Sequence, residues 1–246
     1  MSPIVSVIMP TYNNALYIEE AIESVIYQNI DYELLIIDDA STDNTYQIVK
    51  PYLSDRIRYI KNKKNQGVAK SRNRGVLLAT GVYIAFLDSD DWWKQGKLKT
   101  QIKKMEQTNA VLCYTWRELY SEEGISYKKV MKYPTTVTYK KLLRNNVIAC
   151  SSVVLRNDIA KEFLMEHDEF HEDYLTWIRI VSKYGEAVGI NKPYLNSRMT
   201  ANGKSRNKIK TLKMTYGVYR CLHLNWLLCL YYTGSHVIKS AIRYFI

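Results

Sequence analysis

The chain has 246 residues, of which 47% are hydrophobic and 24% are charged, so it can bury a sizeable core and is not a disordered protein. Its net charge is +11, but ten basic residues and no acidic ones follow Glu186, so residues 1–186 carry only +1. A basic C-terminal part can contact phosphates, a nucleic acid or an anionic membrane surface. The four cysteines have spacings that fit neither a zinc site nor a disulfide framework and predict reduced thiols.

The first 91 residues alternate between short apolar runs and helical patterns. We expect strands at residues 4–9, 34–37, 56–60 and 82–87, with helices over 16–26, after Asp43, and from 65 to 79. Ser41 or Thr42 is suited to cap the second helix. This order predicts an open, mostly parallel α/β sheet with flanking helices. Ligands bind at the carboxyl ends of such strands, so residues 11–12, 38–39 and 88–90 should converge on one crevice.

Three carboxylates, Asp88, Asp90 and Asp91, directly follow the apolar strand at 82–87. Such a cluster repels itself unless a cation or a set of donors neutralises it. Hard divalent cations take one or two carboxylates together with substrate phosphates. The cluster therefore predicts a metal-bound nucleotide diphosphate, and the alternative is a solvated acidic turn.

The second half is less regular. We expect a helix at 96–107, strands at 110–116 and 151–155, a helix from His171, and short closing strands at 188–190 and 194–198. Residues 117–133 suggest a hairpin or a mobile loop. From Lys208 onward, apolar and aromatic residues recur at helical spacing beside basic ones, which predicts a basic amphipathic helical segment.

Five motifs, in order and spacing, resemble the inverting family 2 glycosyltransferases, which have the GT-A fold. They occupy residues 7–13, 36–43, 65–75, 86–91 and 172–173. More narrowly, the forms at 88–92 and 171–173 resemble bacterial enzymes that extend a sugar on a polyprenyl diphosphate during O-antigen, capsule or teichuronic acid assembly. The resemblance spans about residues 4–200.

The resemblance implies a donor site. In that family the positions of Thr11 and Tyr12 hold the nucleotide base, and that of Asp39 accepts the uracil N3 proton. The other implied donor contacts are Arg72 with the base edge or diphosphate, Asp88 with the ribose, and Ser89 beside it. Asp90 would ligate Mg²⁺ or Mn²⁺ between the two phosphates. Helix capping by Asp39 is the plain alternative for that residue.

The resemblance also implies an acceptor site. Asp173 would be the general base, on the face opposite the leaving diphosphate, and Glu172 would orient the acceptor. His171 would lie beside the acceptor pocket, and Trp92 could stack on an acceptor sugar. Alternatively, Asp173 is only a first-turn partner of the helix dipole, and Trp92 and Trp93 are packing residues. Arg198 and Ser205 match the family's phosphate-closing loop only loosely.

These observations predict a catalytic domain over residues 1–203, with a nucleotide-binding half (1–91) and an acceptor-binding half (92–203), followed by a basic, aromatic helical tail (204–246). The N-terminus lacks a basic region and a long apolar run, which predicts a cytoplasmic protein. The apolar stretch at 222–232 is too short to span a bilayer but could lie on one. We expect peripheral association with the anionic inner face of the cell membrane.

The predicted function is a metal-dependent inverting glycosyltransferase that moves a hexose or N-acetylhexosamine from a UDP-sugar to a sugar on a polyprenyl-diphosphate carrier. A sugar-1-phosphate nucleotidyltransferase would need a glycine-rich loop after the first strand, and residues 10–14 contain no glycine. No G-x-G-x-x-G follows a strand, which argues against a dinucleotide-binding oxidoreductase. The remaining alternatives are a non-enzymatic membrane-binding protein and a basic nucleic-acid-binding protein, but no nucleic-acid recognition motif accompanies the charge.

Overall fold

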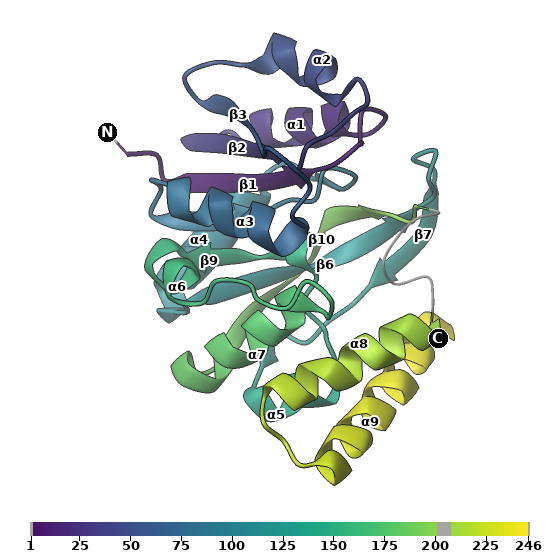
Figure 1. Ribbon diagram of the computed structural model, residues 1–246. Coiled ribbons are helices and arrows are strands. Elements are labelled where there is room, and N and C mark those ends of the chain that lie inside the picture. Colours follow the sequence, from purple (N-terminus) through teal and green to yellow (C-terminus); the bar gives the residue numbers. More distant parts are fainter. Residues whose placement is uncertain (1, 201–207, 246) are drawn as a thin grey trace.

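The computed structural model of the protein describes residues 2–200 and 208–245 (Figure 1). The strands are β1 (Val5–Thr11), β2 (Tyr32–Asp38), β3 (Ile57–Lys61), β4 (Tyr83–Phe86), β5 (Trp92–Trp93), β6 (Leu112–Tyr120), β7 (Ser126–Met131), β8 (Thr136–Val137), β9 (Val154–Arg156) and β10 (Ala187–Arg198). The helices are α1 (Ile18–Ile26), α2 (Thr45–Val49), α3 (Val68–Leu78), α4 (Lys97–Thr108), α5 (Tyr139–Arg144), α6 (Asn157–Glu162), α7 (Glu172–Tyr184), α8 (Lys208–Cys221) and α9 (Trp226–Phe245). Short 3₁₀ helices cover Lys50–Tyr52 and Cys150–Ser152.

All strands belong to one sheet, in the order β3-β2-β1-β4-β9-β6-β10-β5, with β7 paired to β6 and β8 to β10. The first four strands are parallel, and Val7 lies in register with Leu34 on β2 and Ala85 on β4. Beyond β4 the sheet is mixed: β9 is antiparallel to both β4 and β6, while β6 and β10 are parallel. The predicted α/β sheet is confirmed. Helical segments connect the parallel strands β1 to β4, because consecutive parallel strands require a crossover connection.

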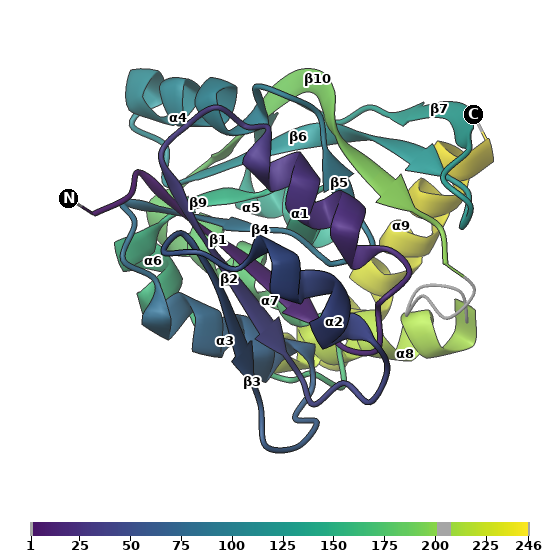
Figure 2. The ribbon, with the colours of Figure 1, turned by 90° about the horizontal axis from the view of Figure 1, so that it is seen from above.

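Helices cover both faces of the sheet, and alternate residues of β1 contribute to two separate cores. Val7 and Met9 face the core shared with α1 and α4. Figure 2 shows this side of the sheet, with α1 in front of it. Ile8 faces the core shared with α3 and α7. This alternation follows from the two-residue period of a strand. It buries β1 completely.

Several local predictions are corrected by the structure. Neither Ser41 nor Thr42 caps α2, because the helix begins later, and the Thr45 N–H donates to Asp43 Oδ1 at 3.0 Å. The two closing strands form a single strand, β10, with an irregular register around Pro193. The segment at 117–133 is a hairpin of β6 and β7. The expected boundary at residues 203 and 204 lies outside the described residues.

The C-terminal helices α8 and α9 pack together against α5 and α7, below the sheet in Figure 1. The Tyr219 hydroxyl on α8 donates to the Leu143 carbonyl at 2.7 Å and lies 3.1 Å from the Tyr174 hydroxyl on α7. Within the described ranges, no helix combines the length and apolar character needed to cross a bilayer.

Candidate active site

The loops after β1, β2 and β4 meet at one edge of the sheet. The Asp39 N–H after β2 donates to the Thr11 carbonyl at the end of β1, at 2.8 Å. The Asn14 side chain donates to the Ser89 hydroxyl after β4, at 2.7 Å. The predicted convergence of the three polar clusters at one edge of the sheet is therefore confirmed, since direct hydrogen bonds join their loops.

Asp39 organises the loop that leads into α3. Its carboxylate accepts hydrogen bonds from the Asn62 amide at 2.8 Å, from the Gln66 N–H at 3.0 Å and from the Gly67 N–H at 2.8 Å. Gly67 has a φ of +93°, and a Cβ there would lie 2.0 Å from Asp168, so only glycine fits this turn. Asp39 thus lies in the predicted donor site, but protein donors already hold it in place.

Thr11 and Tyr12, where β1 ends, offer groups that a ligand could contact. The Thr11 hydroxyl is buried and has no hydrogen-bond partner among the described residues. A buried hydroxyl without a partner is costly, so a ligand that bonds to it recovers free energy. Tyr12 is 49% exposed, which leaves a ring face open for stacking on a planar base.

Arg72 links the two halves of the site. Its guanidinium is buried on α3 and donates to Asp88 Oδ1 at 2.6 Å and to Glu172 Oε1 at 2.7 Å. Burial alone would lower the pKa of Arg72, but Asp88 and Glu172 outweigh it and raise that pKa well above its ordinary value. The structure places Arg72 as a bridge between carboxylates, with its side chain only 5% exposed.

The Asp88, Asp90 and Asp91 carboxylates lie in different surroundings. Asp88 is partly exposed and bonded to Arg72. Burial, and next the neighbouring Asp88, raise the pKa of Asp90 to about 6. Asp91 is buried and accepts the Arg198 N–H of β10 at 3.0 Å, and burial is the main cause that raises its pKa. Asp88 and Asp90 are therefore the members of the cluster that are less enclosed by protein.

Asp173 lies in the first turn of α7, beside Glu172. Its Oδ1 accepts the N–H of Tyr174 at 2.7 Å. Burial and the Glu172 charge raise the pKa of Asp173 to about 7, despite the opposing effect of Arg72. A carboxyl group with a pKa near the working pH is well matched to general-base catalysis. His171 immediately precedes the helix, as its N-cap residue.

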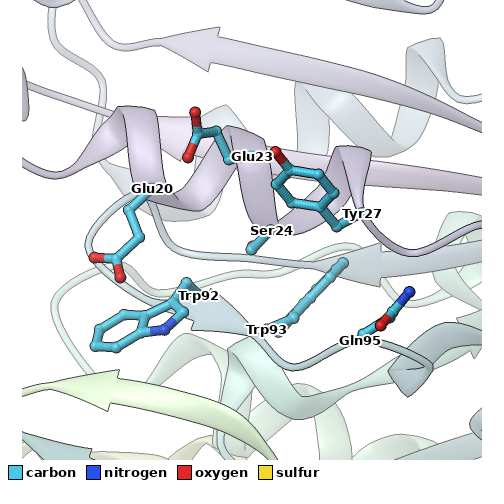
Figure 3. Close-up of a pocket in the computed structure, with 7 residues that line it drawn as sticks. All are labelled: Glu20, Glu23, Ser24, Tyr27, Trp92, Trp93 and Gln95. Carbon is cyan, nitrogen blue, oxygen red and sulfur yellow. The ribbon is translucent and has the colours of Figure 1, made fainter.

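The two tryptophans form β5 and have different roles. The Trp93 indole is buried and donates to the Ser151 carbonyl at 2.7 Å. Trp92 is partly exposed, with its ring centroid 4.6 Å from that of Tyr120 and 4.8 Å from the Arg198 guanidinium carbon. Both line a pocket of about 370 Å³ between α1 and β5, together with Glu20, Glu23, Ser24, Tyr27 and Gln95 (Figure 3). Trp92 is therefore both a packing residue and available to a ligand.

Some supporting residues could not be assigned from the sequence. The Ser151 hydroxyl accepts the Asp88 N–H at 3.1 Å, although no motif marks this position. Arg198 does not lie free to close over phosphates: its guanidinium donates to the Asp90 carbonyl at 3.1 Å and to the Glu122 carbonyl at 2.7 Å. Ser205 lies outside the described residues.

No preassembled metal centre is present in the described part of the chain, since no three His, Cys, Asp or Glu side chains are grouped to hold an ion. The donor set nevertheless fits a hard cation, because Asp88 and Asp90 are carboxylates of like charge in a partly buried loop. A metal here would draw its remaining ligands from a diphosphate and water. This matches the way Mg²⁺ is usually held.

Residues 6–164 match the family described as Glycosyl transferase family 2. TuaG of Bacillus subtilis, a putative teichuronic acid biosynthesis glycosyltransferase, is 35% identical over 89% of this chain and 88% of its own. WfgD of Escherichia coli, a UDP-Glc:alpha-D-GlcNAc-diphosphoundecaprenol beta-1,3-glucosyltransferase, is 36% identical over 96% and 92%.

Solved structures show the same fold at lower sequence identity. Residues 1–349 of S. aureus TarS, in complex with UDP-GlcNAc, match with a TM-score of 0.70 at 22% identity, over 89% of this chain and 65% of theirs. A mannosyltransferase from Pyrobaculum calidifontis, in complex with GDP-Man and Mn²⁺, also matches with a TM-score of 0.70, at 18% identity over 92% and 66%. The fold, the converging carboxylates and these relatives together establish that the chain is a glycosyltransferase and belongs to glycosyltransferase family 2, with the GT-A fold.

Proposed function

We propose that the protein transfers a hexose or N-acetylhexosamine, with inversion, from a UDP-sugar to a sugar on a polyprenyl-diphosphate carrier. The product would enter a bacterial surface polysaccharide of the O-antigen, capsule or teichuronic acid type. Relatives with these activities in their names support the substrate classes. The observation that carries the proposal is the Arg72 bridge, because it joins the carboxylates after β4 to the pair that begins α7.

The donor half, residues 1–91, would bind the nucleotide. Tyr12 offers an exposed ring to the uracil, and the buried Thr11 hydroxyl offers an unused hydrogen bond beside it. Asp39 would accept the N3 proton of uracil through lone pairs that its loop contacts leave free. The partly exposed Asp88 would bind the ribose, with Ser89 beside it. Arg72 would hold the Asp88 carboxylate in position through their ion pair and would not contact the base itself.

Asp90 would be the protein ligand of Mg²⁺ or Mn²⁺. When bound, such an ion neutralises the charge that develops on the departing nucleoside diphosphate. The position of Asp90 in the loop after β4, close to the proposed ribose contact Asp88, supports this role. The raised pKa of Asp90 reflects burial and this like charge, which are the two costs that a cation relieves.

The acceptor half, residues 92–203, would bind the lipid-linked sugar. Asp173 would take the proton of the attacking hydroxyl as that oxygen forms the new bond to the anomeric carbon and the bond to the diphosphate breaks. Glu172, held by Arg72, would fix the helix start that carries Asp173. His171 and Trp92 would contact the acceptor, with Trp92 presenting its ring at the pocket of Figure 3.

We also place the protein at the cytoplasmic face of the membrane as a peripheral protein, because a polyprenyl carrier confines the acceptor to a bilayer. A sugar nucleotidyltransferase is not favoured, since the pair at the start of α7 supplies a base for an acceptor hydroxyl. A nucleic-acid-binding function is not favoured either, because the basic residues accompany an apolar helix face and no recognition motif.

A panel of UDP-sugars, assayed for UDP release with a synthetic GlcNAc- or GalNAc-diphosphate lipid, tests the proposal. We expect acceptor-dependent release with at least one UDP-sugar, and its loss in Asp173→Asn. The matched control is Asp158→Asn, an exposed carboxylate on α6 that pairs only with Arg156 in the described contacts. If Asp173→Asn retained the wild-type transfer rate, the assigned mechanism would be wrong.

A further inference from the structure

Helix α9 presents most of its apolar residues to solvent, whereas Tyr232 and several small or polar residues face the protein. The small or polar inward positions are Cys229 and Thr233, which are buried, followed by the half-buried His236 and Ser240. The outward positions are exposed and almost all apolar: Trp226, Leu227, Leu230, Tyr231, Val237, Ile238 and Ile242. An ordinary surface helix has the reverse arrangement, with the apolar stripe facing the core.

The inward face is held by polar contacts as well as packing. The Ser235 hydroxyl donates to the Arg144 carbonyl at 3.2 Å, and the His236 ring lies 5.8 Å from the Tyr174 ring. These contacts fix the rotation of α9 about its axis, so the outward face is a consequence of how the helix packs. A group of large exposed apolar residues on one helix face marks an interaction site.

The charges carried by α8 and α9 indicate which partner covers this face. Lys213 and Arg220 on α8 and Lys239 on α9 are exposed, and the sequence contains no acidic residue after Glu186. A symmetric pair of copies through this face would bring like charges together. An anionic bilayer instead offers hydrocarbon to the apolar residues and phosphates to the basic ones.

The same helices support the candidate catalytic base. Tyr174, the residue after Asp173, contacts Tyr219 on α8 and His236 on α9. The helix pair α8–α9 therefore lies directly against the first turn of α7. Because His236 faces Tyr174 and the apolar residues of α9 are exposed, a bilayer on α9 would lie on the far side of this helix from Tyr174.

We infer that the outward face of α9 is a membrane-binding surface, which lies flat in the headgroup region of an anionic bilayer and brings the protein to the bilayer that holds its acceptor. The evidence for the binding surface is the exposed apolar face of α9 and the basic residues of α8 and α9. The presence of the acceptor in that bilayer rests on the proposed function.

Co-sedimentation of the full chain with phosphatidylcholine vesicles, with and without phosphatidylglycerol, tests the inference. We expect binding to the anionic vesicles, and a fall of about tenfold or more in the partition coefficient for the triple variant Leu227→Ser, Tyr231→Ser, Ile238→Ser. Lys213→Glu with Arg220→Glu should weaken binding to anionic vesicles and leave binding to neutral ones unchanged. The control is Leu77→Ser with Val82→Ser, which removes equally exposed apolar residues far from α9 in the chain and should bind as wild type.

Transfer to a water-soluble diphosphate-sugar acceptor, measured in parallel, separates this inference from the proposed function. The α9 variant should retain that activity and lose transfer to a vesicle-embedded acceptor. Unchanged vesicle binding by the triple variant would overturn the inference. It would also be overturned if the wild type were a dimer, the triple variant were a monomer, and neither protein bound vesicles. Vesicle binding without any sugar transfer would instead count against the proposed function alone.

Discussion

Replacement of Arg72 by methionine tests the central feature of the site. Methionine has a similar length but no charge, so the substitution removes both ion pairs without leaving a large cavity. Asp88 keeps contact with water, since its side chain is 35% exposed. Glu172 is shielded from water, because its side chain is only 7% exposed, and the variant would remove the Arg72 cation from beside it.

The expected loss of stability follows from these exposures. Removing one partner of a buried ion pair costs about 3–5 kcal/mol, because the other charge stays buried without compensation. Loss of the ion pair between Arg72 and the partly exposed Asp88 adds little to the destabilisation, because solvent screens this pair. We therefore expect Arg72→Met to lower the free energy of unfolding by about 3 kcal/mol, mainly through Glu172. Adding Glu172→Gln should regain part of the lost free energy of unfolding, because it removes the buried carboxylate charge that Arg72 neutralised.

Urea unfolding, followed by tryptophan fluorescence and extrapolated linearly, measures the effect. Lys70→Met is the matched control on the same helix, since Lys70 is exposed and its loss should change stability by no more than about 0.5 kcal/mol. A loss below about 1 kcal/mol for Arg72→Met, or no recovery in the double variant, would refute the reasoning about Glu172.

The same variant has a second readout in the pH dependence of activity. The Arg72 charge lowers the pKa of Asp173, so its removal should raise that pKa further above the wild-type value of about 7. Because a general base acts in its ionised form, the acid limb of the kcat/KM profile should move to higher pH. A limb that stays in place would mean that Arg72 does not influence the base.

Three further predictions concern the base, the metal and a turn. In the wild type, kcat/KM should fall tenfold per pH unit below about pH 7, because Asp173 becomes protonated. Asp173→Asn should lower kcat by about 10²-fold or more. A flat pH profile of kcat/KM from pH 5 to 8 would exclude Asp173 as the base. EDTA should abolish transfer, and Mn²⁺ or Mg²⁺ should restore it. Asp90→Asn should weaken metal binding, so that more metal is needed for half-maximal activity. Full activity in EDTA would remove the metal from the mechanism. Gly67→Ala should destabilise by about 2 kcal/mol or more in thermal melts, since its Cβ would meet Asp168 and φ is +93°. Gly96→Ala, with φ +82° and no atom within 4 Å, should cost less, and equal losses would contradict a steric cause.

The parallel half of the fold was predictable because local signals agree there. Apolar runs that end in polar clusters indicate buried strands, and the helical spacing between them requires parallel crossovers. The convergence of Thr11, Asp39 and Asp88 followed from this topology alone. By contrast, the length of β10 depends on its pairing with the distant strand β6, so the sequence pattern divided it in two. The predicted cap of α2 was wrong because the helix begins later than the pattern indicated.

The chemistry of the site divides in the same way. The sequence by itself supplied the residue types: a carboxylate cluster after a buried strand, an acidic pair at the start of a helix, and a basic, aromatic C-terminus. Only the tertiary structure decided that Arg72 bonds two carboxylates 16 and 100 residues away, because no local pattern records such a pairing. The tertiary structure also decided that the apolar face of α9 points outward. Helical periodicity shows which residues share a face, but not whether that face packs on the protein or meets solvent.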